Sequence, residues 1–456
     1  MAVKFTWQVS CPNANRVDSM QKVKQAMVEE FSLPGLVVRN HRFDVPLDYG
    51  DKSRGNISVF ARELVAPEKA DDKKLPWLLM LNGGPGFQCA RPEDSSGWMK
   101  TALKEFRILL LDQRGTGLSS AITHENVPAP GDAETQARYL THFRADNIVR
   151  DCEFIRGDLV GGEPWTVLGQ SFGGFCITTY LSQAPEGLSG AIITGGLPPM
   201  TENIDDVYRA TYKQVIRKNR EYYNRFPQDA EIVRAVVDHL KSIDVVLPTG
   251  ERLSAERFLS LGILFGFKSA GASMTAVHYL LERAFSDANR KLLSYAFLHG
   301  VESLSSFNTN PVYAILHEAI YCQGVASNWS ADRMLGEFAD FSHKHEPLYF
   351  TGEMIYKWMF EQYSCLRPLK DAAEIIAQHT GWPSLYDFEV LRSNAVPCVA
   401  SVYYDDMYVD RELSLQTAAN IKGIKLWITN EHEHDGIRVD GEAVVGRLMD
   451  MLKGNV

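Results

Sequence analysis

The serine in the hexapeptide GQSFGG, residues 169–174, stands where a reactive hydroxyl could be held in a tight turn. The apolar, strand-like run WTVL precedes it, and a helix-like segment follows it. A G-x-S-x-G turn between a strand and a helix exposes the serine at the helix start, and glycine is needed where neighbouring backbone comes close. The pattern predicts that Ser171 is a nucleophile, and the alternative is a chance turn of glycine and serine.

A second glycine turn, NGGPG at residues 82–86, follows the apolar run PWLLML. On its own this pentapeptide indicates only a turn. Together with the serine turn, it indicates a loop whose backbone N–H groups bind the negative oxygen that forms when a serine attacks a carbonyl. We expect the two donors of this oxyanion hole to be the N–H groups of Gly84 and Phe172.

A serine nucleophile needs a general base, and the base needs a carboxylate that orients it. In this architecture the acid and then the histidine follow the serine along the chain, so both should lie late in the sequence. The apolar run PCVASVYY ends in Asp405 and Asp406, and IKLWIT is followed by His432 and His434. We prefer Asp406 as the acid, and His434 as the base because His-Asp-Gly offers a loop relaxed by glycine. Asp405 and His432 stay open as alternatives.

A third motif, DQRGTG at residues 112–117, also follows an apolar run. Its Asp112 and Arg114 could in principle do chemistry. A charged pair at a strand end followed by glycines more often fixes a loop than takes part in a reaction, so we expect a structural role for both residues.

The elements that must position these residues are short apolar runs. They lie at residues 76–81, 106–112, 165–170, 189–196, 397–404 and 424–429. Such runs are typical of parallel strands covered on both faces, and the helix-length segments between the earlier runs indicate βαβ units. The sequence therefore predicts an α/β fold with a mostly parallel central sheet, whose strand ends converge on one crevice.

The alternation of strand and helix stops near residue 200, and helical periodicity fills the chain to about residue 390. We expect a first part of the core, with an N-terminal extension, at residues 1–200, and a second part at 391–456. A helical cap at 201–390 would be inserted between two late strands. Before the first apolar run, residues 20–31 look like a short helix, and residues 41–50 and 56–66 look like two antiparallel strands.

The composition excludes several classes of protein. The chain has 456 residues, of which 45% are hydrophobic and 23% are charged, as in ordinary globular proteins. A net charge of −10 without basic runs argues against nucleic acid as a partner. The 7 cysteines include no C-x-x-C pair, which argues against a disulfide framework and a zinc site. The sequence starts with no signal-peptide pattern and has no run of roughly 20 apolar residues, so we expect a cytoplasmic protein that does not contact a membrane.

With NGGPG, DQRGTG and GQSFGG in this order, the chain resembles the prolyl aminopeptidase (proline iminopeptidase) family of α/β-hydrolases from about residue 40 to its end. The chain length, the helical insertion and the endings DDMYV and EHDG resemble the larger branch of that family. Within this resemblance, D-M-Y-V implies Asp406 as the acid and E-H-D-G implies His434 as the base. The first motif of the family usually reads HGGPG, so Asn82 departs from it, although backbone donors preserve the oxyanion role.

The family removes an N-terminal proline from peptides. The resemblance therefore implies an α/β-hydrolase fold with a large helical cap, and a serine peptidase that forms an acyl-enzyme without a metal or cofactor. Its substrate would be a peptide or small molecule with a free N-terminal proline. A buried secondary ammonium needs a counter-charge, and Glu318 and Glu353, each among aromatic and aliphatic neighbours, look like the amine-binding glutamates of the family.

Two other interpretations stay open from the sequence. An esterase or amidase of the same fold, acting on a neutral acyl group or a secondary metabolite, would share the triad and the oxyanion hole but would not need the two glutamates. A protein of this fold that only binds a ligand or partner would not need a complete set of serine, acid and histidine. Each glutamate could also lie on the solvated face of a cap helix.

Overall fold

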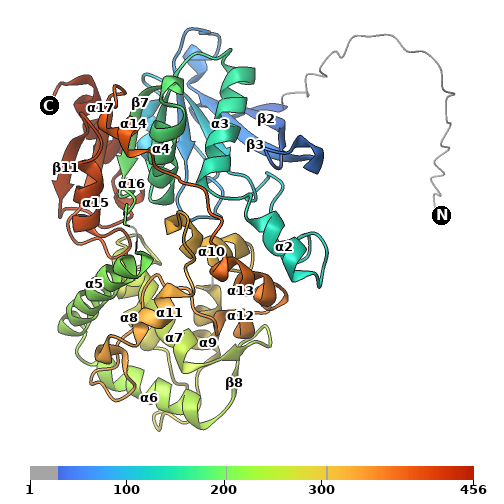
Figure 1. The fold of residues 1–456 in the computed structure, drawn as a ribbon. Coiled ribbons are helices and arrows are strands. Elements are labelled where there is room, and N and C mark those ends of the chain that lie inside the picture. The colour runs from blue at the N-terminus through green and yellow to red at the C-terminus, as the bar shows by residue number, and fades with distance from the viewer. Residues whose placement is uncertain (1–28, 202, 305–306) are drawn as a thin grey trace, which may run out of the picture.

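The computed structural model describes residues 29–201, 203–304 and 307–456, and Figure 1 shows their arrangement. A sheet flanked by helices occupies the upper half of the view, and a body made mostly of helices lies below it. The last strands and helices, in red, return to the sheet beside green elements from the middle of the chain (Figure 1). Two distant parts of the sequence therefore build one core.

Within the described residues, nine strands form one sheet in the order β1-β2-β3-β5-β4-β6-β7-β10-β11. The neighbours from β1 to β5 pair antiparallel, and those from β5 to β11 pair parallel. This confirms the mostly parallel sheet, whose carboxyl ends meet along one edge. The strands are β1 (Glu29–Leu33), β2 (Leu36–Pro46), β3 (Asn56–Val65), β4 (Trp77–Leu81), β5 (Arg107–Asp112), β6 (Trp165–Gln170), β7 (Leu188–Thr194), β10 (Cys398–Tyr403) and β11 (Lys425–Thr429).

Helices cover both faces of this sheet because its central strands are apolar on both sides. Leu79 and Leu81 of β4 pack into a cluster with α3 and α4, whereas Leu78 and Met80 pack into a second cluster with α17. Successive side chains of a strand point to opposite faces, which explains this division. The helices of the core are α1 (Trp98–Ala102), α2 (Ala133–Leu140), α3 (Ala145–Leu159), α4 (Phe172–Gln183), α15 (Arg411–Ala418), α16 (Gly436–Val439) and α17 (Gly441–Lys453).

The chain between β7 and β10, residues 195–397, is named the cap here, and it forms most of the lower body in Figure 1. The expected helical insertion between two late strands is therefore confirmed, while the boundaries at residues 200/201 and 390/391 stay a prediction. The helices of the cap are α5 (Ile204–Arg225), α6 (Asp229–Ser242), α7 (Ala255–Leu259), α8 (Met274–Leu281), α9 (Tyr295–Ser303), α10 (Pro311–Leu316), α11 (Ser330–Leu335), α12 (Met359–Gln362), α13 (Lys370–Gln378) and α14 (Phe388–Arg392).

Two expectations about smaller elements need correction. The cap contains a short antiparallel pair, β8 (Val245–Val246) with β9 (Arg252–Leu253). Strands of two residues are too short to show an alternation of apolar and polar residues in the sequence. The helix expected at residues 20–31 is wrong at its end, because residues 29–31 belong to β1, and residues 20–28 lie outside the described residues. A tight turn at Gly35, with φ of 73°, lets β1 pair with β2, and this pairing outweighs a short helical pattern.

The charged pair of the DQRGTG motif fixes loops, as expected. Asp112 accepts the N–H of Leu118 at 2.9 Å and pairs with Arg91. Arg114 is fully buried and donates from Nε to the carboxylate of Asp151 at 2.7 Å. Because both charges are compensated inside the fold, neither is available to a substrate. None of the described helices is long and apolar enough to cross a membrane.

Candidate active site

Ser171 stands in the sharp turn between β6 and α4, and its backbone lies in the left-handed region with φ of 55°. The flanking glycines make this turn possible. A Cβ on Gly169 would lie 2.5 Å from the carbonyl oxygen of Gly173, and a Cβ on Gly173 would collide with the carbonyl oxygen of Leu81. The turn thus has the geometry that the sequence predicts for a nucleophile, and Ser171 lines a pocket at the carboxyl edge of the sheet.

The NGGPG loop passes directly beside this serine. A Cβ on Gly83 would lie 2.9 Å from the Cβ of Ser171, so only glycine fits there. Gly84 lines the same pocket, and its φ of 141° also favours glycine. The N–H of Phe172 lies in the first turn of α4, where backbone donors have no partner within the helix and the helix dipole favours negative charge. This arrangement suits an oxyanion hole formed by Gly84 and Phe172.

His434 and Asp406 meet at the ends of β11 and β10. The Nδ1 atom of His434 lies 2.7 Å from Oδ2 of Asp406, and Oδ1 of this carboxylate accepts the N–H groups of Tyr408 at 2.8 Å and Val409 at 3.0 Å. Burial opposes a charged imidazole, but the carboxylate of Asp406 outweighs it and raises the pKa of His434 above its ordinary value. Asp406 therefore orients the ring through Nδ1 and leaves Nε2 free for proton transfer.

Ser171 and His434 line the same pocket. Among the described residues there is no hydrogen bond between the hydroxyl of Ser171 and Nε2 of His434. Catalytic contacts of this kind often tighten only when a substrate is bound. The structure thus brings the three residues to one site, with the bond between acid and base formed.

The neighbouring acid and histidine point elsewhere. Asp405 pairs with Arg217 of α5, and its side chain is 34% exposed. The ring of His432 faces Trp427, with 5.9 Å between the ring centres, and His432 does not line the pocket. The geometry therefore separates Asp406 and His434 from the alternatives that the sequence leaves open.

The pocket beside Ser171 has a volume of about 390 Å³ and combines apolar walls with one carboxylate. Glu353 lines it, and its Oε1 accepts the hydroxyl of Tyr313 at 2.7 Å. Burial raises the pKa of Glu353 to about 7, while the hydrogen bond from Tyr313 and the charge of His434 oppose the rise. The apolar walls are Phe87, Ile263, Leu264, Phe267, Leu304 and Tyr313.

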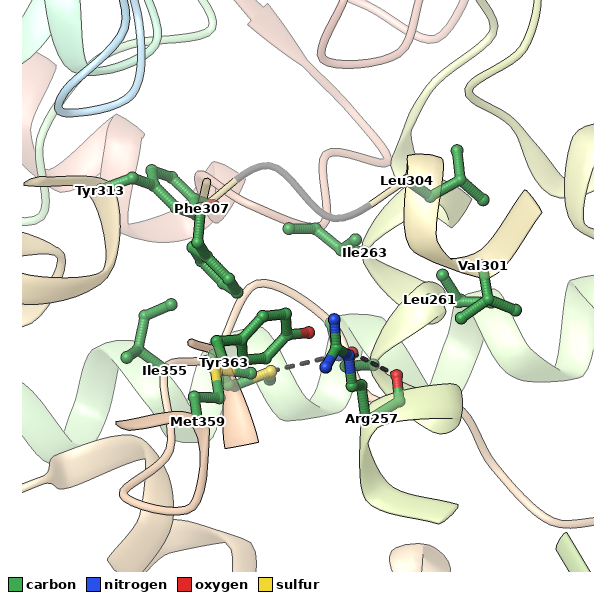
Figure 2. Close-up of a pocket in the computed structure, with 13 residues that line it drawn as sticks. Arg257, Leu261, Ile263, Val301, Leu304, Phe307, Tyr313, Ile355, Met359 and Tyr363 are labelled. Atoms are coloured by element: carbon green, nitrogen blue, oxygen red, sulfur yellow. Dashed lines mark hydrogen bonds between the residues drawn. The ribbon is translucent and has the colours of Figure 1, made fainter. Parts of the chain in front are cut away.

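A smaller cavity of about 40 Å³ adjoins this pocket behind Tyr313, Ile263 and Leu304, which line both spaces. Figure 2 shows it as an apolar space with Arg257 at one side, near Tyr363. The guanidinium of Arg257 is paired with Glu251 at 2.6 Å, so its charge is already compensated. The carboxylate of Glu353 therefore carries the charge on the cap side of the larger pocket.

Comparison with known proteins assigns this site to a family. A model of the alpha/beta hydrolase fold matches residues 76–260. A proline iminopeptidase from Aeromonas sobria is 47% identical over 421 residues, which cover 92% of this chain and 97% of the relative. The chain belongs to the proline iminopeptidase family of α/β-hydrolases. Another curated member, proline iminopeptidase aneH from Aspergillus aculeatus, is 35% identical over 91% of this chain and 93% of the relative.

Solved structures are similar at lower identity. The crystal structure of a proline iminopeptidase from Mycobacterium smegmatis is 13% identical, with a TM-score of 0.46 over 91% of this chain and 98% of that chain. A thermophilic esterase from Thermogutta terrifontis is 13% identical, with a TM-score of 0.42 over 91% of this chain and 98% of that chain.

In this member of the proline iminopeptidase family, the structure places the two expected glutamates differently. Glu318 is 7% exposed and does not line the pocket. Its carboxylate accepts the N–H of Ser330 at 3.1 Å and the N–H of Ala331 at 2.9 Å, at the start of α11. Glu318 thus binds backbone inside the cap, and the structure brings only Glu353 to the serine.

Sequence reasoning missed the residues that hold the loop of His434 against the cap. Glu433 pairs with the buried Lys218 of α5 at 2.7 Å, and Asp435 accepts the N–H of Ser269 at 2.8 Å. Both carboxylates flank His434 in the sequence EHEHDG, and this alternation of acidic residues was the available signal. The loop that carries His434 is therefore anchored to the cap by carboxylates on both sides of this histidine.

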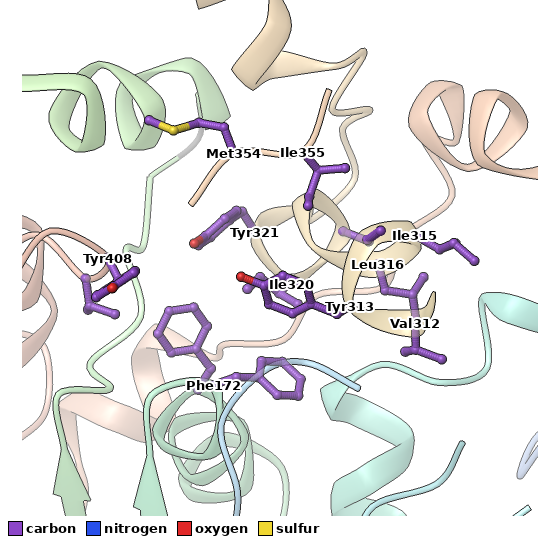
Figure 3. Packing of buried hydrophobic residues seen from close by; sticks show 14 of the residues in the cluster. Phe172, Val312, Tyr313, Ile315, Leu316, Ile320, Tyr321, Met354, Ile355 and Tyr408 are labelled. Carbon is purple, nitrogen blue, oxygen red and sulfur yellow. The ribbon is translucent and has the colours of Figure 1, made fainter. Parts of the chain in front are cut away.

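Aromatic packing between core and cap was also missed. Tyr313 and Tyr321 of the cap and Phe172 of α4 belong to one buried cluster, which Figure 3 shows from close by. Phe87, next to the NGGPG loop, packs against Tyr313 with 5.2 Å between the ring centres. This packing positions the hydroxyl of Tyr313, the donor to Glu353, relative to the loops that flank Ser171. Among the described residues, no cluster of three His, Cys, Asp or Glu side chains is arranged to hold a metal ion.

Proposed function

We propose that the protein releases N-terminal proline from peptides through an acyl-enzyme, as a prolyl aminopeptidase. The observation that carries this proposal is the carboxylate of Glu353 in the pocket of Ser171 and His434. A hydrolase of neutral acyl groups gains nothing from an enclosed carboxylate, whereas a substrate with a free ammonium needs one. The names and extent of the curated relatives support the same activity.

The proposed reaction begins when Nε2 of His434 takes the proton of Ser171 and the serine oxygen attacks the prolyl carbonyl. The N–H groups of Gly84 and Phe172 bind the oxyanion of the tetrahedral intermediate. His434 then donates its proton to the leaving amine. Asp406 stabilises the imidazolium between these two transfers and keeps the ring in the required tautomer. Water, activated by the same histidine, releases proline from Ser171.

The substrate ammonium completes the charge balance of the pocket. In an empty pocket at pH 7 the carboxyl of Glu353 is about half protonated, since burial raises its pKa to about 7. A cation beside this group favours the carboxylate, so binding and ionisation support each other. The apolar residues around Glu353 suit the methylene groups of the proline ring. One wall of the pocket thus fits both parts of an N-terminal proline.

The test is hydrolysis of a proline arylamide compared with its N-acetylated form, with Ser171→Ala as the blank. We expect cleavage of the free-amine substrate alone and no turnover by the variant. A second control is His432→Ala, which should keep most of the activity, whereas His434→Ala should lose nearly all of it. Equal cleavage of both arylamides, or cleavage of a simple ester and neither arylamide, would favour an esterase or amidase with the same triad.

A further inference from the structure

Arg438 stands one helical turn after His434, on α16, and its side chain is exposed. It lines the pocket of Ser171 and also a second pocket of about 240 Å³. Its guanidinium has no hydrogen bond or ion pair with any residue that the structure describes, in contrast to the other charged groups of the site. An arginine at the junction of two pockets, with all its donors free, is available to a ligand.

The second pocket continues the first on the side away from Glu353. Asn82, Ala90, Gln170 and Arg438 line both, while Glu353 and Tyr313 line only the pocket of the serine. The far end of the second pocket reaches Trp98 and Arg91. Arg91 donates from Nη1 to Asp112 at 3.0 Å, so its charge is neutralised within the protein. Of the two arginines here, Arg438 is the one left for an anion.

The positions of the general base and of Glu353 indicate that the leaving part of the substrate enters this second pocket. The histidine must reach the leaving nitrogen to protonate it, so the leaving peptide lies on the side of His434. Arg438 lines both pockets, whereas Glu353 lines only the pocket of the serine. With the ammonium at Glu353, the second pocket is therefore the space left for the leaving peptide.

We propose that Arg438 binds the C-terminal carboxylate of the leaving peptide and makes the protein selective for short prolyl peptides of two or three residues. This inference rests on the proposed function. In such a peptide the carboxylate follows the scissile nitrogen by one or two residues, each of which adds at most about 3.6 Å. Arg438 lines the pocket of the serine itself as well as the second pocket, where so short a leaving peptide would end, and its guanidinium can bind a carboxylate with two parallel hydrogen bonds.

The two charged groups thus recognise the two charged ends of a short substrate. Glu353 faces the ammonium, and Arg438 faces the carboxylate, with the scissile bond between them at Ser171. A peptide amide or an arylamide has the first charge but lacks the second. The selectivity is therefore visible as a ratio between a peptide acid and its own amide.

The experiment measures kcat/KM for Pro-Ala and for Pro-Ala amide with the wild-type protein, Arg438→Gln and Arg438→Lys. The matched control is Arg447→Gln, which removes one exposed positive charge on α17, and Arg447 lines neither pocket. We expect the acid-to-amide ratio to fall about 10- to 150-fold in Arg438→Gln, the range for a lost hydrogen bond to a charged group. Arg438→Lys should recover part of the ratio, and Arg447→Gln should keep it.

An unchanged ratio in Arg438→Gln, or an equal fall in Arg447→Gln, would overturn the role of Arg438. These results would leave the proposed function intact, because the wild-type protein would still cleave the amide. Failure of the wild-type protein to cleave either peptide, with a neutral ester hydrolysed, would instead overturn the proposed function and this inference with it.

Discussion

Two carboxylates of the cap have similar surroundings in the sequence and different partners in space. Glu318 lies inside the cap, where two backbone N–H groups at the start of α11 satisfy its oxygens. Glu353 lies at the wall of the serine pocket, and one tyrosine hydroxyl is its hydrogen-bond partner among the described residues. Burial raises the pKa of both.

This difference separates a structural carboxylate from one that can bind a ligand. A carboxylate accepts about four hydrogen bonds. Each oxygen of Glu318 accepts a backbone N–H that cannot move away without unfolding α11, and this carboxylate does not line the pocket. Glu353 keeps unused acceptor capacity, and that capacity faces a pocket large enough for a substrate. A buried acidic residue among aromatic neighbours is therefore informative only when its remaining acceptors face open space.

The largest effect should come from Glu353→Gln, which keeps the shape of the side chain and removes its charge. We expect kcat/KM for a proline arylamide to fall about 100- to 5000-fold, since breaking a buried ion pair costs roughly 3–5 kcal/mol. Steady-state kinetics of the purified variant measures the loss. A fall of less than threefold would show that Glu353 does not face the ammonium.

The same substitution should stabilise the protein at alkaline pH. The pKa of Glu353 rises to about 7 on folding, so the folded state holds a proton that the unfolded state has released. Stability from this group is therefore lost as pH rises from about 4.5 to 7. We expect the free energy of unfolding of Glu353→Gln to exceed that of the wild-type protein by about 1–3 kcal/mol at pH 8 and by much less at pH 5. Urea unfolding at both pH values measures this difference in unfolding free energy. A difference that does not change with pH would contradict the raised pKa of Glu353.

Activity should also depend on the ionisation of Glu353. The carboxylate that binds the ammonium is lost as pH falls through about 7. The ratio of kcat/KM between the wild-type protein and Glu353→Gln should therefore fall about tenfold from pH 8 to pH 6. The charge of Glu353 also raises the pKa of His434, so the pH profile of each protein is first corrected for the titration of its own base. A ratio independent of pH would place the relevant charge elsewhere.

Glu318→Gln should have the smallest effect on catalysis. A glutamine can accept only one of the two N–H groups, so we expect a loss of about 1–3 kcal/mol in the free energy of unfolding. The folded variant should keep kcat/KM for a proline arylamide within about threefold, because Glu318 does not line the pocket. Denaturant unfolding and kinetics on the same sample separate the two quantities. A large loss of kcat/KM at full stability would contradict the structural role.

The core positions of the site could be predicted because strand ends determine them. Ser171, Asp406 and His434 each follow an apolar run that becomes a strand of the sheet. Parallel strands bring their carboxyl ends to one edge, so order along the chain becomes proximity in space. The choice between Asp405 and Asp406 was beyond spacing alone, because adjacent residues in a loop point in different directions.

The cap could be predicted only as a helical insertion. Its short helices have no common edge at which side chains gather. Glu318 and Glu353 both have apolar neighbours in the sequence, so this pattern could not distinguish their different positions in the structure. The pairing of Lys218 with Glu433 joins residues far apart in the chain, and no local pattern records such a contact. The free guanidinium of Arg438 likewise becomes visible only when its surroundings are known.

The central claim is that the substrate ammonium binds against the carboxylate of Glu353, and proton release on binding tests it most directly. Isothermal titration of L-prolinamide into Ser171→Ala, in buffers of different ionisation enthalpy, gives the number of protons released. We expect Ser171→Ala to release about half a proton more at pH 7 than Ser171→Ala/Glu353→Gln, because a carboxyl with a pKa of about 7 is then half protonated. Equal proton release by the two proteins would contradict the claim.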